Sequence, residues 1–281
     1  MHVSYKGLEI AVVTRHGKDA AIRPVVEMHT GAKVRLESRL DTDCFGTFTR
    51  EIARPGTQAS ALRSKLQQGM NRYGHKIGIA SEGAFSPHPY GFCTLNVEMV
   101  MLIDTVHNLS LHGMHETAET NYSHAVLCSF EEVVDFANKA GFPSHHLIMR
   151  PDHSNAGGIL KDIDSVERLE RAFHECMKIS FDRKVFIETD MRADRNPTRM
   201  KAIRMAAMDL IALLNSRCPY CETPGFAVTE RLRGLPCEIC GSKTRGVTAE
   251  IKSCNRCGHI ETYSNPYGEA EQAMYCDLCN P

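Results

Sequence analysis

Cys218-Pro-Tyr-Cys221, Cys237-Glu-Ile-Cys240, Cys254-Asn-Arg-Cys257 and Cys276-Asp-Leu-Cys279 are four copies of one short pattern. The two-residue gap lets both sulfurs of a pair bind one tetrahedral Zn²⁺ at about 2.3 Å, and a second pair completes the coordination. A single pair would also suit a redox motif, but four pairs close together indicate metal binding. The eight thiolates therefore predict two Zn²⁺ ions, each held by four cysteines.

The spacing of the pairs does not decide which of them share a metal ion. Sequential pairing would join the first pair with the second and the third with the fourth. Nested pairing would join the second with the third and the first with the fourth. The strand-like segment 247–253 lies between the second and third pairs, and this order is typical of one complete zinc ribbon. We therefore favour nested pairing.

The composition is that of an ordinary globular protein with one sizeable core and an appendage. Hydrophobic residues make up 42% of the 281 residues, charged residues 24%, and the net charge is −1. This charge indicates no general attraction to nucleic acid or to an anionic membrane. No apolar run approaches the roughly 18–20 residues of a membrane span, and the first residues lack a signal-peptide pattern.

The cysteines outside the four pairs also indicate the cellular compartment of the protein. They are Cys44, Cys93, Cys128 and Cys176. Metal-type spacing combined with scattered single cysteines is typical of a reducing compartment. We therefore expect a cytoplasmic protein with no membrane partner.

Strands and helices alternate through residue 215, which predicts an α/β domain. Two successive β-rich runs, 97–104 and 109–115, suggest a hairpin, so the sheet should be mixed, with flanking helices. Few large apolar residues follow residue 215. The chain should therefore divide into an α/β domain, 1–215, and a small zinc-ribbon-type domain, 216–281, with two four-cysteine sites.

The turn after the first expected strand suits an anion. The strand 9–14 ends at Arg15-His16-Gly17-Lys18, and a helix follows. A glycine-containing turn before a helix directs backbone N–H groups at an anion. His16 and Lys18 would add positive charge. An ordinary strand-to-helix turn without a ligand explains the same residues.

A third run of β-formers, from Ile77, passes directly into Ser81-Glu82-Gly83. Small residues around Glu82 leave room for a ligand beside its carboxylate. His88 lies between two prolines, in a rigid loop that would fix its ring in place. We therefore predict that Glu82 and His88 take part in an active site.

Charged residues are concentrated where the last core strand is expected to meet a helix. They are Glu188, Asp190, Arg192, Asp194, Arg195 and Arg199. One interpretation is a solvated cluster of salt bridges. The other is phosphate recognition, because a guanidinium can bind two phosphate oxygens at once. We favour phosphate or substrate binding by Asp190, Arg192 and Arg199.

Four of these segments, in this order, resemble motifs of the house-cleaning nucleoside triphosphate pyrophosphatases, which include the inosine/xanthosine triphosphatases. The segments are the turn 14–18, the helix from Thr57 to Lys65, the stretch 81–84 and the helix start 198–203. The family has a Thr-x-Asn-x-x-Lys turn, an Asn-Ala-x-x-Lys-Ala helix, an acidic Ser/Glu-Gly turn and a Ser-His-Arg-x-x-Ala helix.

The resemblance spans residues 9–205 and implies a cleft between two α/β lobes, with Mg²⁺ held by carboxylates. The chain departs from the family motifs in several respects: the first turn is one residue shorter, and in the late motif only Arg199 and Ala202 match. His16 stands where Asn is expected, Ser60 replaces the metal-binding Glu, and Ala61 replaces an Asn. With its cysteine-rich end, the whole chain also looks like an uncharacterised bacterial family, which implies no activity.

The first functional hypothesis is a Mg²⁺-dependent, pyrophosphatase-like hydrolase acting on a nucleotide or another phosphorylated small molecule. Phosphate oxygens would be bound by basic side chains, namely Lys18, Lys65, Arg192 and Arg199. Glu82, with Asp41 or Asp43, would hold Mg²⁺ or orient the attacking water. The metal and the cations would stabilise charge that develops on the phosphoryl oxygens.

The second hypothesis is a non-catalytic zinc-ribbon adaptor with a ligand-sensing α/β domain. Nucleic acid is disfavoured as a partner, because the segment 216–281 is acidic and each four-thiolate zinc adds about −2. Its basic residues are Arg217, Arg231, Arg233, Lys243, Arg245, Lys252 and Arg256. Its acidic residues are Glu222, Glu230, Glu238, Glu250, Glu261, Glu269, Glu271 and Asp277.

Overall fold

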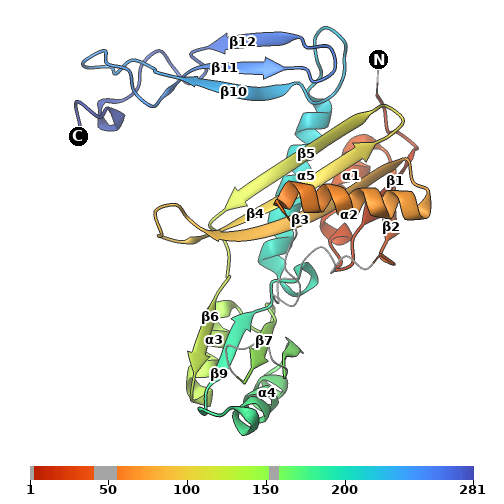
Figure 1. Cartoon of the computed structure of the whole chain (residues 1–281), viewed down its shortest axis with the longest axis vertical. Helices are drawn as coiled ribbons and strands as arrows, with labels where there is room; N and C mark the ends of the chain where they lie inside the picture. The colour runs from red at the N-terminus through yellow and green to blue at the C-terminus, as the bar shows by residue number, and fades with distance from the viewer. Residues whose placement is uncertain (1–2, 41–55, 152–157) are drawn as a thin grey trace. The chain divides into compact units, whose positions relative to one another are not determined.

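The computed structural model describes residues 3–40, 56–151 and 158–281 (Figure 1). The chain forms two compact units. The first, the α/β unit, is Tyr5–Ile211, and the second, the cysteine-rich unit, joins Met1–Ser4 to Ala212–Pro281. The boundary falls inside the last helix, α5 (Pro197–Asn215). Among the described residues, no helix combines the length and the apolar character needed to cross a bilayer.

A five-stranded mixed sheet is the centre of the α/β unit. Its strands are β1 (Glu9–Val13), β2 (Lys33–Glu37), β3 (Ile77–Pro87), β4 (Thr94–Asp104) and β5 (Leu109–Thr117), in the order β2-β1-β3-β4-β5. β1 pairs in parallel with β2 and β3, whereas β3, β4 and β5 form an antiparallel meander. The mixed α/β fold expected from the sequence is therefore confirmed.

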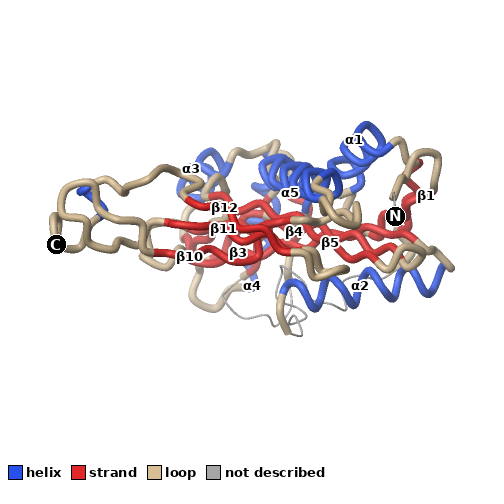
Figure 2. Tube along the Cα trace, turned by 90° about the horizontal axis from the view of Figure 1, so that it is seen from above, coloured by secondary structure: helices blue, strands red, loops and turns tan. Residues whose placement is uncertain are grey.

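The helices around this sheet are distributed over both faces. α1 (Asp19–Thr30) connects β1 to β2, and α2 (Gln58–Tyr73) lies between β2 and β3 in the chain. Figure 2 shows α1 and α5 on one side of the strands and α2 on the other. The crossover from β1 to β2 and the crossover from β2 to β3 run in opposite directions along the sheet, and this produces the arrangement. The carboxyl end of β1 is therefore a topological switch point, where open α/β sheets bind their ligands.

Glycines let the helices approach the sheet closely. A Cβ at Gly113 of β5 would collide with the backbone of α5 at Leu210. On the other face, a Cβ at Gly69 of α2 would lie 2.7 Å from the methyl carbons of Val13. Leu62 and Leu66 of α2, both fully buried, fill the space between that helix and the sheet.

Four short strands form a second, antiparallel sheet within the α/β unit, in the order β6-β9-β7-β8. They are β6 (His124–Leu127), β7 (Leu147–Arg150), β8 (Leu160–Ile163) and β9 (Val185–Thr189). α3 (Phe130–Ala140) and α4 (Val166–Ile179) pack on one face, around Val133, Leu169 and Ile187. A capping box, in which Ser129 and Glu132 bond each other's backbone, begins α3.

The cysteine-rich unit contains a three-stranded antiparallel sheet. Its strands are β10 (Ala227–Arg233), β11 (Val247–Ser253) and β12 (Ile260–Ser264). Apart from its cysteines, few apolar side chains of this unit are buried, namely Val3, Leu214, Phe226, Leu235 and Ala249. The sheet cannot rely on a hydrophobic core of ordinary size.

Candidate metal centres and a buried ionic site

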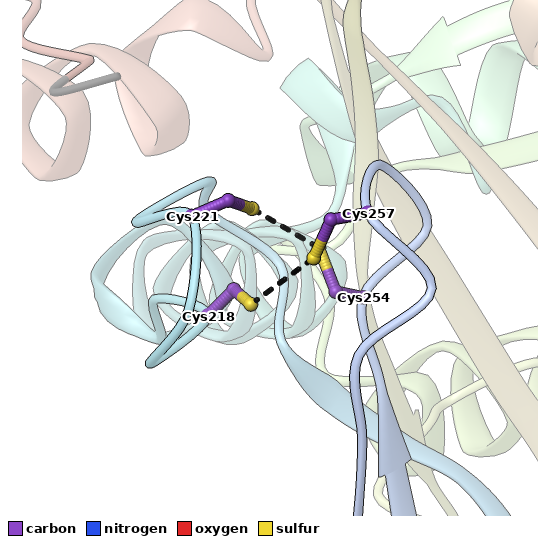
Figure 3. A group of neighbouring side chains, drawn as sticks. All are labelled: Cys218, Cys221, Cys254 and Cys257. Atoms are coloured by element: carbon purple, nitrogen blue, oxygen red, sulfur yellow. Dashed lines mark hydrogen bonds between the residues drawn. The ribbon is translucent and has the colours of Figure 1, made fainter.

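Cys218, Cys221, Cys254 and Cys257 form the first of two cysteine groups. Figure 3 shows the four sulfurs turned toward one another, two from the turn after α5 and two from the turn after β11. The Sγ atoms of Cys218 and Cys257 are 3.7 Å apart, and those of Cys221 and Cys254 are 3.6 Å apart. Phe226 packs against this group.

Cys237, Cys240, Cys276 and Cys279 form the second group. Its sulfur separations are 3.8 Å between Cys237 and Cys279 and 3.7 Å between Cys240 and Cys276. A tetrahedron of sulfurs about 2.3 Å from Zn²⁺ has edges of about 3.8 Å. Both groups therefore fit a four-thiolate zinc centre, and each could hold one metal ion.

The pairing favoured from the sequence is wrong. The first pair joins the third, and the second joins the fourth, which is neither nested nor sequential. The reason is β10, a strand that the sequence analysis did not predict. Each seven-residue strand separates the pairs at its two ends by about 23 Å. β10 carries the chain from the first pair to the second, and antiparallel β11 returns it to the first.

Local hydrogen bonds favour the thiolate form of two of these cysteines. The side chain of Thr223, and then its backbone N–H, lower the pKa of Cys221 to about 6. Ser242 has the same effect on Cys240, whose pKa is also lowered to about 6. Because only the thiolate binds Zn²⁺ well, these turns prepare the sulfurs for the metal.

A separate cluster of charged residues lies buried at the switch point of the α/β unit. Lys65 of α2 contacts Glu82 of β3, with 2.7 Å between its Nζ and the Oε2 of Glu82. The same Nζ donates to the carbonyl oxygen of Ser81 at 2.6 Å, and the Nζ of Lys18 donates to that oxygen at 3.2 Å. The pairing of β1 with β3 ends at Val12 and Ile79, so Ser81 lies beyond it. Its carbonyl oxygen therefore accepts no hydrogen bond from β1 and can accept hydrogen bonds from side chains.

The cluster continues on the other side of β3 with Arg199 and Glu98. Arg199, near the start of α5, donates from Nε to the Oε1 of Glu98 at 2.6 Å, and both side chains are almost fully buried. Arg199 also donates from Nη1 to the carbonyl oxygen of Met191. Gly83 lies opposite Glu98 in the β3–β4 pairing, and a Cβ there would lie 2.6 Å from the Oε1 of Glu98. Only glycine leaves room for this ion pair.

Lys18 is the most perturbed group of this cluster. Burial lowers the pKa of its ammonium to about 7, and the positive charges of Lys65 and Arg199 lower it further, whereas Glu82 and Glu98 act in the opposite direction. Lys18 therefore loses its proton far more readily than an exposed lysine does. A small change in nearby charge would change the protonation state of Lys18.

The lowered pKa predicts a stability that depends on pH. Between pH 7 and pH 10.5 the unfolded chain carries a proton on Lys18 that the folded chain has lost. The free energy of unfolding should therefore rise with pH by about 1.4 kcal/mol per unit in this window. In Lys18→Met this contribution should vanish, as measured by urea unfolding at pH 7.5, 8.5 and 9.5. Parallel pH profiles for the two proteins would contradict the buried-lysine assignment.

Asp190 and Arg192 belong to a different cluster. Arg192 contacts Asp190 at 2.5 Å and Asp162 at 2.9 Å, and Arg195 contacts Asp162 at 2.7 Å. Burial opposes the charge of Arg192, but these carboxylates raise its pKa well above the ordinary value. The two arginines are thus held by ion pairs, as the salt-bridge interpretation expected. Phosphate binding by Arg192 would have to displace one of these partners.

Of the other predicted residues, His88 is not brought to the buried cluster. β3 continues through Glu82 to Pro87, so Glu82 lies within a strand and not in a turn. His88 lies in the loop after β3, about 20 Å along the chain from Glu82, and its ring contacts Tyr90 and Phe92. His16 lies, partly buried, in the β1–α1 turn. Asp41 and Asp43 fall outside the described residues.

Glu98 is the member of the cluster that the sequence analysis missed. A signal for it exists, since Glu98 is a single carboxylate within the apolar strand run from Val97 to Ile103. A charge in such a run is either at the surface or paired in the interior. The partner, Arg199, is 101 residues away in the chain, so the pair itself requires the fold.

Aromatic rings extend from the cluster toward the second sheet. The guanidinium of Arg199 lies 5.8 Å from the ring centre of Phe85, and this ring stacks on Tyr122 at 5.3 Å. Tyr122 contacts His124, which in turn stacks on Phe186 at 5.5 Å. These residues connect the ionic cluster to the face of β6 and β9 that lies opposite α3 and α4.

The fold and these two kinds of site define the chain as a mixed α/β protein with a cysteine-rich, metal-binding type of C-terminal unit. The chain belongs to the family described as "Domain of unknown function (DUF6671)", whose model matches residues 65–281. No curated protein matches the chain. The match places the chain in this family but indicates no activity for it.

One solved structure among those that match is a dodecamer of a PelC point variant from Paraburkholderia phytofirmans. It is 9% identical, and the match covers 50% of this chain and 93% of that chain, with a TM-score of 0.24. A match at this TM-score carries no argument about fold or function.

Proposed function

We propose that the protein is a hydrolase acting on a nucleotide or another phosphorylated small molecule at the buried ionic cluster. The observation that supports this most strongly is the meeting of Lys18, Lys65, Glu82 and Arg199 at the switch point of the sheet. These residues come from four segments that are far apart in the chain. Open α/β sheets bind ligands at this position for topological reasons.

The charge balance of the cluster suits a phosphate group. Lys18, Lys65 and Arg199 are three cations, and Glu82 and Glu98 are two carboxylates, which leaves one positive charge in excess when Lys18 is protonated. A bound phosphate would raise the pKa of Lys18 by supplying the opposite charge. Lys18 would then be fully protonated. Its ammonium would stabilise the negative charge that develops on the phosphoryl oxygens during hydrolysis.

The rings beside Arg199 favour a nucleotide over a simple phosphate ester. Phe85 and Tyr122 stack on each other, and His124 stacks on Phe186. Nucleobases stack on such rings, at about 1–3 kcal/mol per base. If the phosphates of a nucleotide bound at Arg199, its base would lie beside Phe85 and Tyr122.

The described part of the cluster has no carboxylate left over for Mg²⁺. Glu82 and Glu98 are engaged with Lys65 and Arg199, and among the described residues only the two cysteine groups bring three or more possible metal ligands together. A magnesium site would need Asp41 or Asp43, which lie outside those residues.

We further propose that each cysteine group holds one structural Zn²⁺ and that the protein works in the reducing cytoplasm. The sulfur geometry supports the metal, and thiolates free of disulfides favour that compartment. Both sites use four protein ligands, so neither keeps the open position that catalytic zinc needs. Hydrolysis is therefore assigned to the α/β unit.

The test is release of phosphate or pyrophosphate from a panel of nucleoside mono-, di- and triphosphates by the zinc-loaded protein, with and without Mg²⁺. We expect turnover of some member of the panel and a loss of at least about 100-fold in Glu82→Gln, which removes the charge that holds Lys65. Glu116→Gln, an exposed carboxylate on β5, is the matched control and should keep full activity. Absence of turnover across the panel would refute the hydrolase.

The alternative is a ligand-binding adaptor without catalysis. It is favoured by one observation, the engagement of both described carboxylates of the cluster in ion pairs. Isothermal titration calorimetry with the same nucleotides distinguishes the two proposals. Binding that is lost in Lys65→Met, together with no turnover, would select the adaptor.

A further inference from the structure

A cavity of about 630 Å³ lies between the beginnings of α1 and α5, which cover the same face of the large sheet (Figure 2). Pockets for small molecules measure about 300–1,000 Å³ and are mostly apolar, with a few polar groups. Most residues that line this cavity are small or apolar, namely Gly17, Ala20, Ala21, Ala193, Pro197 and Met200. The cavity therefore has the size and the character of a ligand pocket.

Short side chains on the α1 wall account for the empty space. α1 contributes Ala20 and Ala21, and the turn before it contributes Gly17. A Cβ at Gly17 would lie 3.3 Å from the Cβ of Asp194, so the two walls come into contact at that end. The α5 wall carries Met200, whose unbranched side chain adapts to an irregular space.

Two cations on the α5 wall have no partner in the part of the chain that the structure describes. Lys201 and Arg204 are exposed, and neither forms an ion pair or a side-chain hydrogen bond with a described residue. Residues three apart share one face of a helix, where like charges repel each other. The carboxylate of the lining, Asp194, contacts Arg195 at 3.6 Å. Two cations against one carboxylate leave the lining with an excess positive charge, which an anionic ligand would neutralise.

The charges and the lining together favour one class of ligand. A guanidinium binds two phosphate oxygens at once, and an ammonium adds a compact charge. A phosphate monoester carries about −1.5 to −2 at pH 7, which matches Lys201 and Arg204 together, whereas a carboxylate would satisfy only one of them. The apolar lining would remove an apolar group attached to that phosphate from water.

We propose that the cavity between α1 and α5 binds a phosphate monoester with an apolar body, whose phosphate contacts Lys201 and Arg204. None of Lys18, Lys65 and Arg199 lines the cavity, so this site is separate from the buried ionic cluster. The proposal therefore does not depend on the hydrolase.

Octyl phosphate is a suitable probe because it carries both parts of such a ligand. Isothermal titration calorimetry with the full-length, zinc-loaded protein at pH 7.5 compares it with inorganic phosphate, 1-octanol and octanoate. Octyl phosphate should bind, and each of the other three should bind at least about tenfold more weakly. The reason is that inorganic phosphate lacks the apolar body, octanol lacks the charge, and octanoate has only one negative charge.

Three variants locate the binding site. Arg204→Met should weaken octyl phosphate binding about tenfold or more, because it removes a charged hydrogen-bond donor. Ala20→Leu should weaken it by a similar factor, because the larger side chain fills the cavity, and leucine is a good helix former that leaves α1 intact. Arg171→Met removes an exposed arginine of α4 that does not line the cavity, and it should change the affinity by no more than about twofold.

The opposite results are equally clear. Octyl phosphate that does not bind the wild-type protein, or that binds Arg204→Met and Ala20→Leu as tightly as the wild type, would overturn the site. Equal affinity for inorganic phosphate would overturn the apolar body, and equal affinity for 1-octanol would overturn the role of the cations. Nucleotide turnover in Glu82→Gln tests the hydrolase separately, so a failure of one proposal does not imply a failure of the other.

Discussion

Removal of metal by an excess of a high-affinity chelator is expected to unfold the cysteine-rich unit and to leave the α/β unit folded. Phe226 and Leu235 are the largest buried apolar side chains between residues 216 and 281, and together they contribute about 5 kcal/mol. Each structural zinc contributes about 10–16 kcal/mol. Amide hydrogen exchange should show loss of protection in β10, β11 and β12 and retained protection in β1, β3 and β4.

Single cysteine substitutions test the crossed pairing of the two sites. Cys254→Ser and Cys276→Ser should each lower the zinc content from two ions to one, and Cys128→Ser, an exposed cysteine outside both groups, should keep two. In Cys276→Ser the remaining metal should protect Cys218, Cys221, Cys254 and Cys257 from alkylation. Protection of any other set, read by mass spectrometry, would contradict the pairing.

Arg199→Met is expected to destabilise the α/β unit by about 3–5 kcal/mol, because it leaves the carboxylate of Glu98 buried without its partner. The double variant Glu98→Met with Arg199→Met should recover most of this loss, since apolar side chains of similar size can replace a buried pair. Urea unfolding monitored by far-UV circular dichroism gives the three free energies.

The thermodynamic cycle decides whether the two residues act as one unit. Coupled residues give an interaction energy of about 0.5–3 kcal/mol or more, and independent residues give additive effects. Arg204→Met, an exposed arginine five residues further along α5, is the matched control and should change stability by no more than about 0.5 kcal/mol. Additive losses in the double variant would show that the pair is not a unit.

The sequence predicted most of the α/β unit because its signals are local. The hydrophobic runs at β1 and β4 and the capped helices α2 and α3 carry their own start and stop residues, such as Thr57 and Ser129. β6 and β8 have only four residues each, too few for a periodic pattern. β10 is almost entirely exposed, so it shows no alternation of apolar and polar residues.

The candidate site was predicted in part for a similar reason. Lys18 follows a glycine-containing turn and Arg199 lies near the start of a helix, whereas Lys65 lies within α2 and Glu82 within β3. The structure brings these four residues together. Glu98 was missed because its meaning depends on Arg199, which only the fold brings near. The cysteine pairing was mispredicted because an unseen strand, β10, sets the distance between the first two pairs.

The most direct test is a crystal structure of the zinc-loaded protein with a bound methylene-bridged nucleotide. The central claim, that the switch-point cluster is a phosphate site, predicts phosphoryl oxygens within hydrogen-bond distance of the Nζ of Lys18, the Nζ of Lys65 or the guanidinium of Arg199. Nucleotide bound at another surface, with the Lys65–Glu82 and Arg199–Glu98 pairs unchanged, would contradict it.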